Sequence, residues 1–189
     1  MRGTGQKCVF FDRDGVVNES PGPGYVERWE DFKLLPDFVR VLRLVRRRGY
    51  PAVIVSNQRG VARGVVPAAE VERIHRELRV VLRDRHGLDL LDIFYCPHDL
   101  GQCTCRKPAP GMLLAAAERH GLDLSASWMV GDHEKDVEAG SRAGCRTILL
   151  GPGDGPTAAD YQVEDLKALE RLFARLLDKP AAGDGVHNP

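Results

Sequence analysis

KCVFFDRDGVVN, residues 7–18, joins a short apolar run to a group of charged residues. The run ends abruptly at Asp12, and Arg13, Asp14 and Gly15 follow it directly. A compact apolar stretch of this length is typical of a strand in the middle of a parallel sheet. Because open α/β sheets bind ligands beyond the carboxyl ends of their strands, the charged residues after this run are candidate site residues.

Similar apolar runs recur along the chain, and helical patterns separate them. The runs are PAVIVSN (51–57), LLDIFYC (90–96), SWMVGD (127–132) and RTILLG (146–151). Helical patterns span residues 37–49, 67–87, 110–121, 133–144 and roughly 164–177. Asp37 is the predicted N-cap of the first helix, and Gly49 is its predicted end. The alternation predicts an α/β fold: a doubly wound, mainly parallel Rossmann-like sheet with helices on both faces and right-handed crossovers.

The chain of 189 residues fits one domain with enough apolar content for a core. We expect this domain to span residues 7–177, between a flexible N-terminus (1–6) and a flexible tail (178–189). Residues 151–160 read as a surface loop. The Arg46 to Arg48 run fits a solvated helix end, where basic side chains favour the helix dipole.

The overall charge argues against general binding to polyanions. The chain has 27 basic and 27 acidic side chains and a sequence pI near 7.0, so it has no global basic field for nucleic acid or an anionic membrane. It has neither a run of eighteen apolar residues nor a recognisable leader. We therefore expect a cytoplasmic protein that acts on a small molecule, as a monomer.

Carboxylates and a hydroxyl gather at the predicted ends of three strands. Asp12 and Asp14 follow the first run, Ser56 lies at the end of the second, and Asp132 ends the fourth. Alone, each aspartate is better interpreted as a helix cap or a solvated turn, but together they form a hard-oxygen site suited to Mg²⁺. A carboxylate nucleophile beside a second carboxyl that moves protons can cleave a phosphoester, and Ser56 and Lys107 could hold the phosphoryl oxygens.

Four motifs, in order, resemble those of the haloacid dehalogenase superfamily. They are FFDRDGVVN (10–18), VIVSNQ (53–58), RKPAPGM (106–112) and VGDHEKD (130–136). The resemblance implies that Asp12 is the nucleophile, that Asp14 is the general acid/base, and that Ser56 and Lys107 hold the phosphate. It also implies that Asp12, Asp132 and the main-chain carbonyl of Asp14 bind Mg²⁺, with Asp136 supporting the site.

Three cysteines and a histidine cluster between the third strand and the third motif. Cys96, His98, Cys103 and Cys105 offer four ligands that fit tetrahedral Zn²⁺ in a closed structural site, with free thiols or a disulfide as the alternatives. Such a site would position Lys107, which follows closely. The remaining cysteines, Cys8 and Cys145, fit buried core positions, and the other histidines are not compelling ligands.

Within the superfamily, the chain resembles the D-glycero-D-manno-heptose 1,7-bisphosphate phosphatases and the related histidinol-phosphate phosphatases. The resemblance rests on Asn18, on residues 24–26, 57–64 and 107–112, and on the loop 96–105 that carries the three cysteines and His98, called here the cysteine loop. The implied substrate contacts are Tyr25, Asn57, Gln58, Arg59, Arg106 and His133. The chain departs from the pattern at Arg59, at His133, in the long stretch 19–23 and in the short cysteine loop.

These observations predict a Mg²⁺-dependent phosphatase that acts through an aspartyl-phosphate and removes the 7-phosphate of the heptose bisphosphate. Histidinol phosphate or another small sugar phosphate is the alternative substrate. A noncatalytic zinc-binding scaffold is the alternative of a different class, but it would not need the aspartates, Ser56 and Lys107 together. The motifs leave no room for a separate cap domain, so loops 19–30, 58–65 and 97–106 would provide selectivity.

Overall fold

The computed structural model describes residues 5–152 and 155–177. The predicted tail at 178–189 lies outside the described residues, as do the first four residues of the predicted flexible N-terminus. Gln6, within that segment, pairs with Leu122. No helix in the described ranges has the length and apolar character needed to cross a lipid bilayer.

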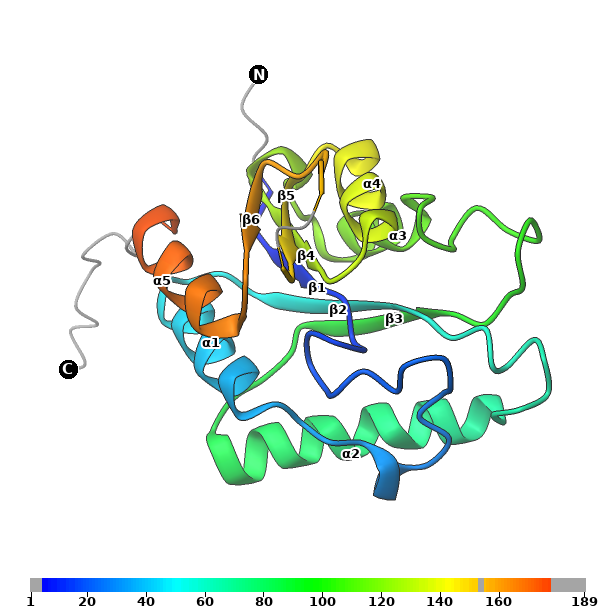
Figure 1. Ribbon diagram of the computed structural model, residues 1–189. Coiled ribbons are helices and arrows are strands. Elements are labelled where there is room, and N and C mark those ends of the chain that lie inside the picture. Colours follow the sequence, from blue (N-terminus) through cyan, green and yellow to red (C-terminus); the bar gives the residue numbers. More distant parts are fainter. Residues whose placement is uncertain (1–4, 153–154, 178–189) are drawn as a thin grey trace.

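A six-stranded, all-parallel sheet forms the centre of the molecule (Figure 1). In chain order the strands are β1 (Val9–Phe11), β2 (Ala52–Asn57), β3 (Asp92–Cys96), β4 (Trp128–Gly131), β5 (Arg146–Leu150) and β6 (Tyr161–Val163). In space their order is β3-β2-β1-β4-β5-β6. The predicted doubly wound sheet is confirmed, with β1 fully buried at its middle.

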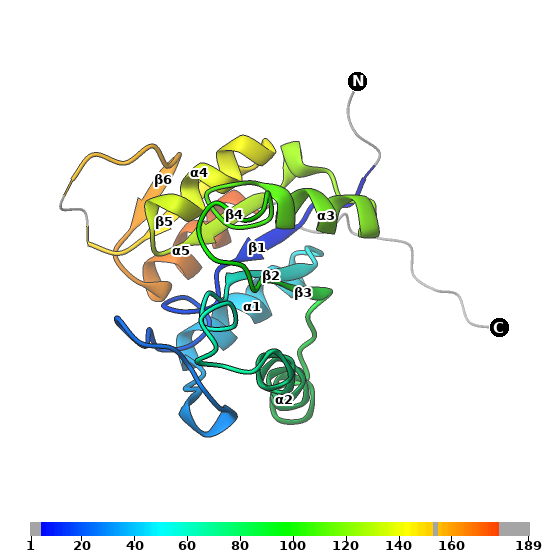
Figure 2. The same cartoon turned by 90° about the vertical axis from the view of Figure 1, so that its right-hand side faces the viewer.

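Helices cover both faces of the sheet (Figure 2). They are α1 (Pro36–Arg47), α2 (Ala68–His86), α3 (Gly111–His120), α4 (Glu134–Ala143) and α5 (Leu166–Leu176). The larger core joins α1, α2 and α5 to one face, and the smaller core joins α3 and α4 to the other. No cap domain is evident among these elements.

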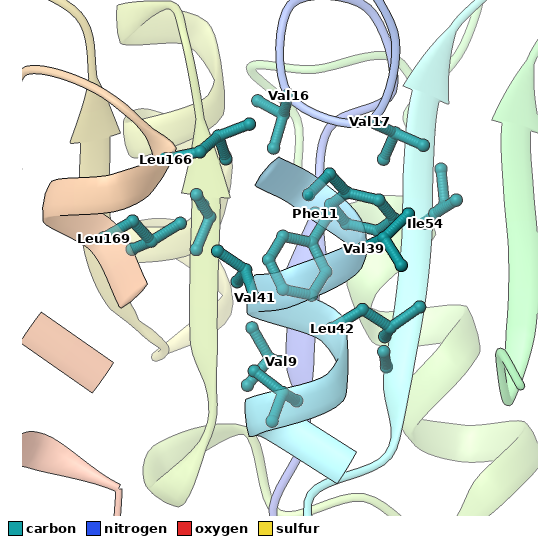
Figure 3. Packing of buried hydrophobic residues seen from close by; sticks show 14 of the residues in the cluster. Val9, Phe11, Val16, Val17, Val39, Val41, Leu42, Ile54, Leu166 and Leu169 are labelled. Carbon is teal, nitrogen blue, oxygen red and sulfur yellow. The ribbon is translucent and has the colours of Figure 1, made fainter. Parts of the chain in front are cut away.

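Alternate side chains of β1 point into the two cores. Phe11 points into the larger core, where it meets Phe38 of α1 edge to face at 5.3 Å and lies among Ile54, Leu42 and Val39 (Figure 3). Truncating a buried phenylalanine to alanine typically costs about 3–5 kcal/mol of stability. This packing fixes the strand whose end carries Asp12.

The order of strands places a crevice between the ends of β1 and β4. The helix that follows β1 covers one face of the sheet, whereas the helix that follows β4 covers the other. At such a switch point the loops after the two strands separate and leave a cleft for ligand. Asp12 and Asp132 follow the two strands directly, so the fold brings them together.

Three sequence-based expectations need correction or completion. The N-cap of α1 is Leu35 and not Asp37, because Pro36 takes the first helical position. The loop predicted at 151–160 is followed by the short strand β6, which was not predicted. Arg48 does more than face solvent, because its guanidinium donates to the carbonyls of Ala174 and Leu177 and ties α1 to α5.

Candidate active site

A cavity of about 330 Å³ opens at the carboxyl ends of β1, β2 and β4. Four parts of the sequence surround it: the loop after β1, the residues after β2, Arg106 ahead of α3, and the segment from Asp132 to the start of α4. Its lining includes Asp12, Asp14, Ser20, Tyr25, Val26, Asn57, Gln58, Arg59, Arg106, Asp132, His133 and Lys135. The six predicted substrate contacts all line this cavity, together with the three aspartates predicted for catalysis and Mg²⁺.

Asp12 lies at the floor of the cavity, held by the buried ammonium group of Lys107. Lys107 Nζ donates to Asp12 Oδ1 at 2.6 Å and to the carbonyl of Val55 at 2.8 Å. Burial raises the pKa of Asp12 to about 7; Lys107 opposes this rise and the neighbouring Asp136 adds to it. No described residue donates a hydrogen bond to Asp12 Oδ2, so this oxygen is available to a substrate or a cation.

Asp136 is the second carboxylate bound to Lys107. The two groups pair at 2.7 Å, and both side chains are fully buried. Burial by itself lowers the pKa of Lys107, but the carboxylates of Asp12 and Asp136 raise it above its usual value. Lys107 Nζ thus hydrogen-bonds Asp12 and Val55 and pairs electrostatically with Asp136, so it holds Asp12 in place. Its role as a phosphate ligand stays a prediction.

Asp132 reaches the cavity from the end of β4 and is more exposed than Asp12. Its carboxylate lies so close to the turn after β1 that a Cβ on Gly15 would sit 1.9 Å from Asp132 Oδ2. Gly15 also has φ +88°, a left-handed conformation that favours glycine. Gly15 therefore lets the two acidic strand ends approach each other.

The donor set fits a magnesium ion. Carboxylate oxygens of Asp12, Asp132 and Asp136 all lie within 4.8 Å of one another, and ligands on opposite sides of Mg²⁺ lie about 4.2 Å apart. Lys107 is the one ammonium group that pairs with them among the described residues, and it leaves the group with excess negative charge. A divalent cation would balance that charge and favour the ionised form of Asp12.

A hydrogen-bonded network connects Asp14 to Ser56. Gln58 Nε2 donates to Ser56 Oγ at 2.7 Å and to Asp14 Oδ2 at 3.3 Å, and Asn18 Nδ2 donates to Asp14 Oδ1 at 2.9 Å. Ser56 is 1% exposed and lies beneath the cavity lining. Its hydroxyl is thus close to the reacting region but covered by Gln58.

The cysteine loop forms a compact cluster of four ligand atoms. Cys105 Sγ lies 3.1 Å from the sulfurs of Cys96 and Cys103 and 3.4 Å from His98 Nδ1. These sulfur separations exceed the about 2.05 Å of a disulfide, and all five cysteines are free. Four such atoms within 4.8 Å of one another fit tetrahedral Zn²⁺ at about 2.3 Å from each sulfur.

The loop is also fastened to the rest of the site. Gly111, at the start of α3, has no room for a side chain because a Cβ there would lie 2.3 Å from the carbonyl oxygen of Thr104. Asn57 exchanges two hydrogen bonds of 3.0 Å with the backbone of Lys107. The cysteine loop, α3 and β2 therefore hold the Lys107 backbone between them.

The basic residues at the cavity mouth differ in whether other protein groups already pair with them. Arg59 pairs with Asp99 of the cysteine loop, and Asp99 also lies 3.8 Å from Arg63. His133 Nδ1 accepts from Lys135 N at 3.3 Å, so His133 caps α4. Arg106 donates only to the carbonyl of His98, at 3.4 Å, and its charge has no carboxylate partner among the described residues.

Two charged residues at the site were not singled out by sequence analysis. Lys135 lines the cavity on the first turn of α4, and no carboxylate pairs with its ammonium group in the described part of the chain. Arg13 lies in a motif already singled out, but its contacts depend on the fold. The signal that could have identified Lys135 is its place only three residues after Asp132 in the fourth motif.

Residues 104–171 match the HAD-hydrolase-like family. The chain is 34% identical over 173 residues to the D-glycero-beta-D-manno-heptose-1,7-bisphosphate 7-phosphatase of Pseudomonas putida, a match covering 87% of this chain and 98% of the relative. The chain belongs to the heptose-bisphosphate phosphatase family. It is also 35% identical over 188 residues to the Escherichia coli K12 relative of the same name, covering 92% of this chain and 96% of that protein.

A solved structure supports this family assignment. The crystal structure of D,D-heptose 1,7-bisphosphate phosphatase from B. bronchiseptica, complexed with magnesium and phosphate, gives a TM-score of 0.80 at 31% identity. The match covers 89% of this chain and 98% of that one. The predicted membership of the haloacid dehalogenase superfamily is thus confirmed, and the protein is a HAD-type phosphatase.

Proposed function

We propose that this phosphatase removes the 7-phosphate from D-glycero-D-manno-heptose 1,7-bisphosphate through a phosphoenzyme on Asp12. The observation that carries the proposal is that Asp12, whose Oδ2 accepts no hydrogen bond from a described residue, lines the same cavity as Asp14 and Asp132. The names of the relatives supply the substrate, and they include both a beta and an alpha anomer.

The chemistry follows from the two aspartates after β1. Asp12 attacks the phosphorus atom, and the bond from phosphorus to the sugar oxygen breaks as Asp14 gives its proton to that oxygen. Asp14 then takes a proton from the water that attacks the phosphoaspartate, which releases inorganic phosphate and restores Asp12. Lys107 keeps Asp12 in place and offsets part of its charge.

Magnesium would bind to Asp12, Asp132 and the main-chain carbonyl of Asp14, where it would offset the negative charge of the transferring phosphoryl group. Zinc would bind to Cys96, His98, Cys103 and Cys105 in a structural role.

The second phosphate of the substrate needs cations away from the reacting centre. Arg106 and Lys135 are the best candidates at the mouth, because neither forms an ion pair within 4 Å among the described residues. Arg59 is less suited than the sequence suggested, since Asp99 neutralises it. His133 is engaged in capping α4. Histidinol phosphate has no second phosphate and carries positive charge, so such a mouth disfavours it.

A substrate panel tests the proposal. We expect kcat/KM to be higher for the heptose bisphosphate, in one or both anomers, than for heptose 7-phosphate or histidinol phosphate. Arg106→Ala and Lys135→Ala should each lower kcat/KM for the bisphosphate about 10–100-fold, the equivalent of a charge-assisted hydrogen bond, with little change for the 7-phosphate. Arg47→Ala, at an exposed position of α1 outside the cavity lining, is the control. Faster turnover of histidinol phosphate would instead assign the alternative activity.

A further inference from the structure

Arg13, between the two reacting aspartates, is a fully buried cation. Its side chain has 0% exposure, although it follows Asp12 directly at the edge of the cavity. A buried guanidinium group is costly unless its donors are paired. The partners of Arg13 therefore indicate what the charge does.

The main partner of Arg13 is Asp14. Arg13 Nε donates to Asp14 Oδ1 at 3.1 Å, while Nη2 donates to Oδ1 at 3.0 Å and to Oδ2 at 3.1 Å. This is a fork in which one planar group contacts both carboxylate oxygens, and such geometry fixes the direction of a carboxylate as well as binding it. A lysine could supply the charge at this position but not the fork.

Two groups hold the guanidinium from behind. Arg13 Nη1 lies 3.5 Å from His75 Nε2 of α2, and the guanidinium carbon lies 5.9 Å from the ring centre of Phe32. Burial, followed by the charge of Arg13, lowers the pKa of His75 to about 3. His75 is thus neutral and can accept a hydrogen bond from Arg13.

We infer that Arg13 is a positioning residue, which aims the Asp14 carboxyl group at the bridging oxygen of the phosphoester. The inference rests on the proposed function, in which the proton of Asp14 moves to the sugar oxygen as the phosphorus–oxygen bond breaks. His75 on α2 holds Arg13, and Arg13 in turn holds Asp14. His75 and Arg13 are 62 residues apart in the chain. Arg13 touches neither phosphorus nor leaving group.

The leaving group of the substrate separates this role from a merely structural one. A sugar hydroxyl leaves poorly without a proton, whereas p-nitrophenol is acidic enough to leave without one. Arg13→Lys should therefore lower kcat/KM about 100-fold for the sugar phosphate and only a few-fold for p-nitrophenyl phosphate. Because kcat/KM covers the steps up to release of the first product, hydrolysis of the phosphoenzyme does not affect this comparison.

A second signature follows from the base role of Asp14. A misdirected Asp14 slows attack of water on the phosphoaspartate, so Arg13→Lys should release a burst of p-nitrophenol, approaching one equivalent per enzyme. Arg48→Lys, which alters an arginine tying α1 to α5 away from the cavity, should change neither the substrate ratio nor the burst.

The variant Asp14→Asn distinguishes failure of the proposed mechanism from failure of the inferred role of Arg13. If Asp14→Asn does not discriminate between the two substrates, the proposed mechanism is wrong and the inference falls with it. If Asp14→Asn discriminates but folded Arg13→Lys does not, Arg13 does not position Asp14. Should Arg13→Lys fail to fold, His75→Phe decides, because it removes the acceptor behind Arg13 and keeps an aromatic ring beside Tyr95. If His75→Phe lowers kcat/KM for the sugar phosphate more than for p-nitrophenyl phosphate, by less than expected for Arg13→Lys, the inference is supported. If the ratio of the two kcat/KM values is unchanged, the inference is overturned.

Discussion

Replacing Lys107 with methionine tests whether the ammonium group balances the buried carboxylates. The substitution keeps an unbranched side chain but leaves Asp12 and Asp136 without the cation that contacts them at 2.6 and 2.7 Å. Removing one partner of a buried ion pair typically costs about 3–5 kcal/mol. In a chain of this size each kcal/mol lowers Tm by about 2–4 °C, so we expect a fall of roughly 6–20 °C.

Urea unfolding of metal-free protein, followed by circular dichroism, measures this cost. The double variant Lys107→Met/Asp136→Asn should recover about 1–2 kcal/mol, because it also removes one of the two unpaired charges. Lys167→Met, on the exposed side of α5, should stay within about 0.5 kcal/mol of the parent protein. The turnover of Lys107→Met should be very low, because loss of the cation favours the protonated form of Asp12. If Lys107→Met lowers the free energy of unfolding by less than about 1 kcal/mol and keeps near-normal turnover, Lys107 does not balance the buried carboxylates.

Other substitutions test the nucleophile, the zinc cluster and the close approach at the magnesium site. Asp12→Asn should abolish turnover and the trapping of a phosphoenzyme while leaving the circular dichroism spectrum intact, because an amide is a poor nucleophile; near-normal activity would contradict this role. Purified protein should contain about one zinc ion per chain by elemental analysis. Cys103→Ser should lower zinc content, Tm and activity, whereas full zinc content and an unchanged Tm in that variant would rule out ligation by Cys103. Gly15→Ala should raise the Mg²⁺ concentration for half-maximal activity about 10–100-fold, because the new Cβ displaces the Asp132 carboxylate. Gly64→Ala is the matched control, since Gly64 also has positive φ, at +68°, but nothing lies within 4 Å of its Cβ; equal effects of the two substitutions would contradict the argument.

The strands that could be predicted from the sequence are those with long apolar runs. All five predicted strands exist. Burial on both faces explains the continuous apolar runs of β1, β2 and β4, whereas β3 is half-buried at one edge of the sheet but is five residues long. The missed strand β6 has only three residues, Tyr161–Val163, and lies at the edge of the sheet. Its side chains are half-buried or exposed, so no apolar run marks it. Asp37 resembled a helix cap because the sequence alone does not reveal that the preceding proline already occupies the first helical position.

In the candidate site, too, the residues next to apolar runs could be predicted, whereas contacts made only in the folded chain could not. The aspartates after β1 and β4 could be predicted because each adjoins an apolar run, and the fold brings parallel strand ends together. The contacts of Arg13 could not be predicted, since an arginine between two aspartates looks like solvated charge until α2 supplies His75. The pairing of Arg59 with Asp99 joins two loops whose relative position is set only by the folded chain.

The position of β1 at the centre of the sheet has a consequence for synthesis on the ribosome. Val9 pairs with Ala52 on one side and with Trp128 on the other. The second partner is made about 120 residues after the first strand, which at 5–20 residues per second is a delay of roughly 6–24 s. Throughout that delay the nascent chain carries an apolar strand with an unpaired edge, the kind of edge that recruits other chains. Chaperone demand during translation should therefore depend on how quickly β4 emerges, and slow codons between β3 and β4 should favour aggregation.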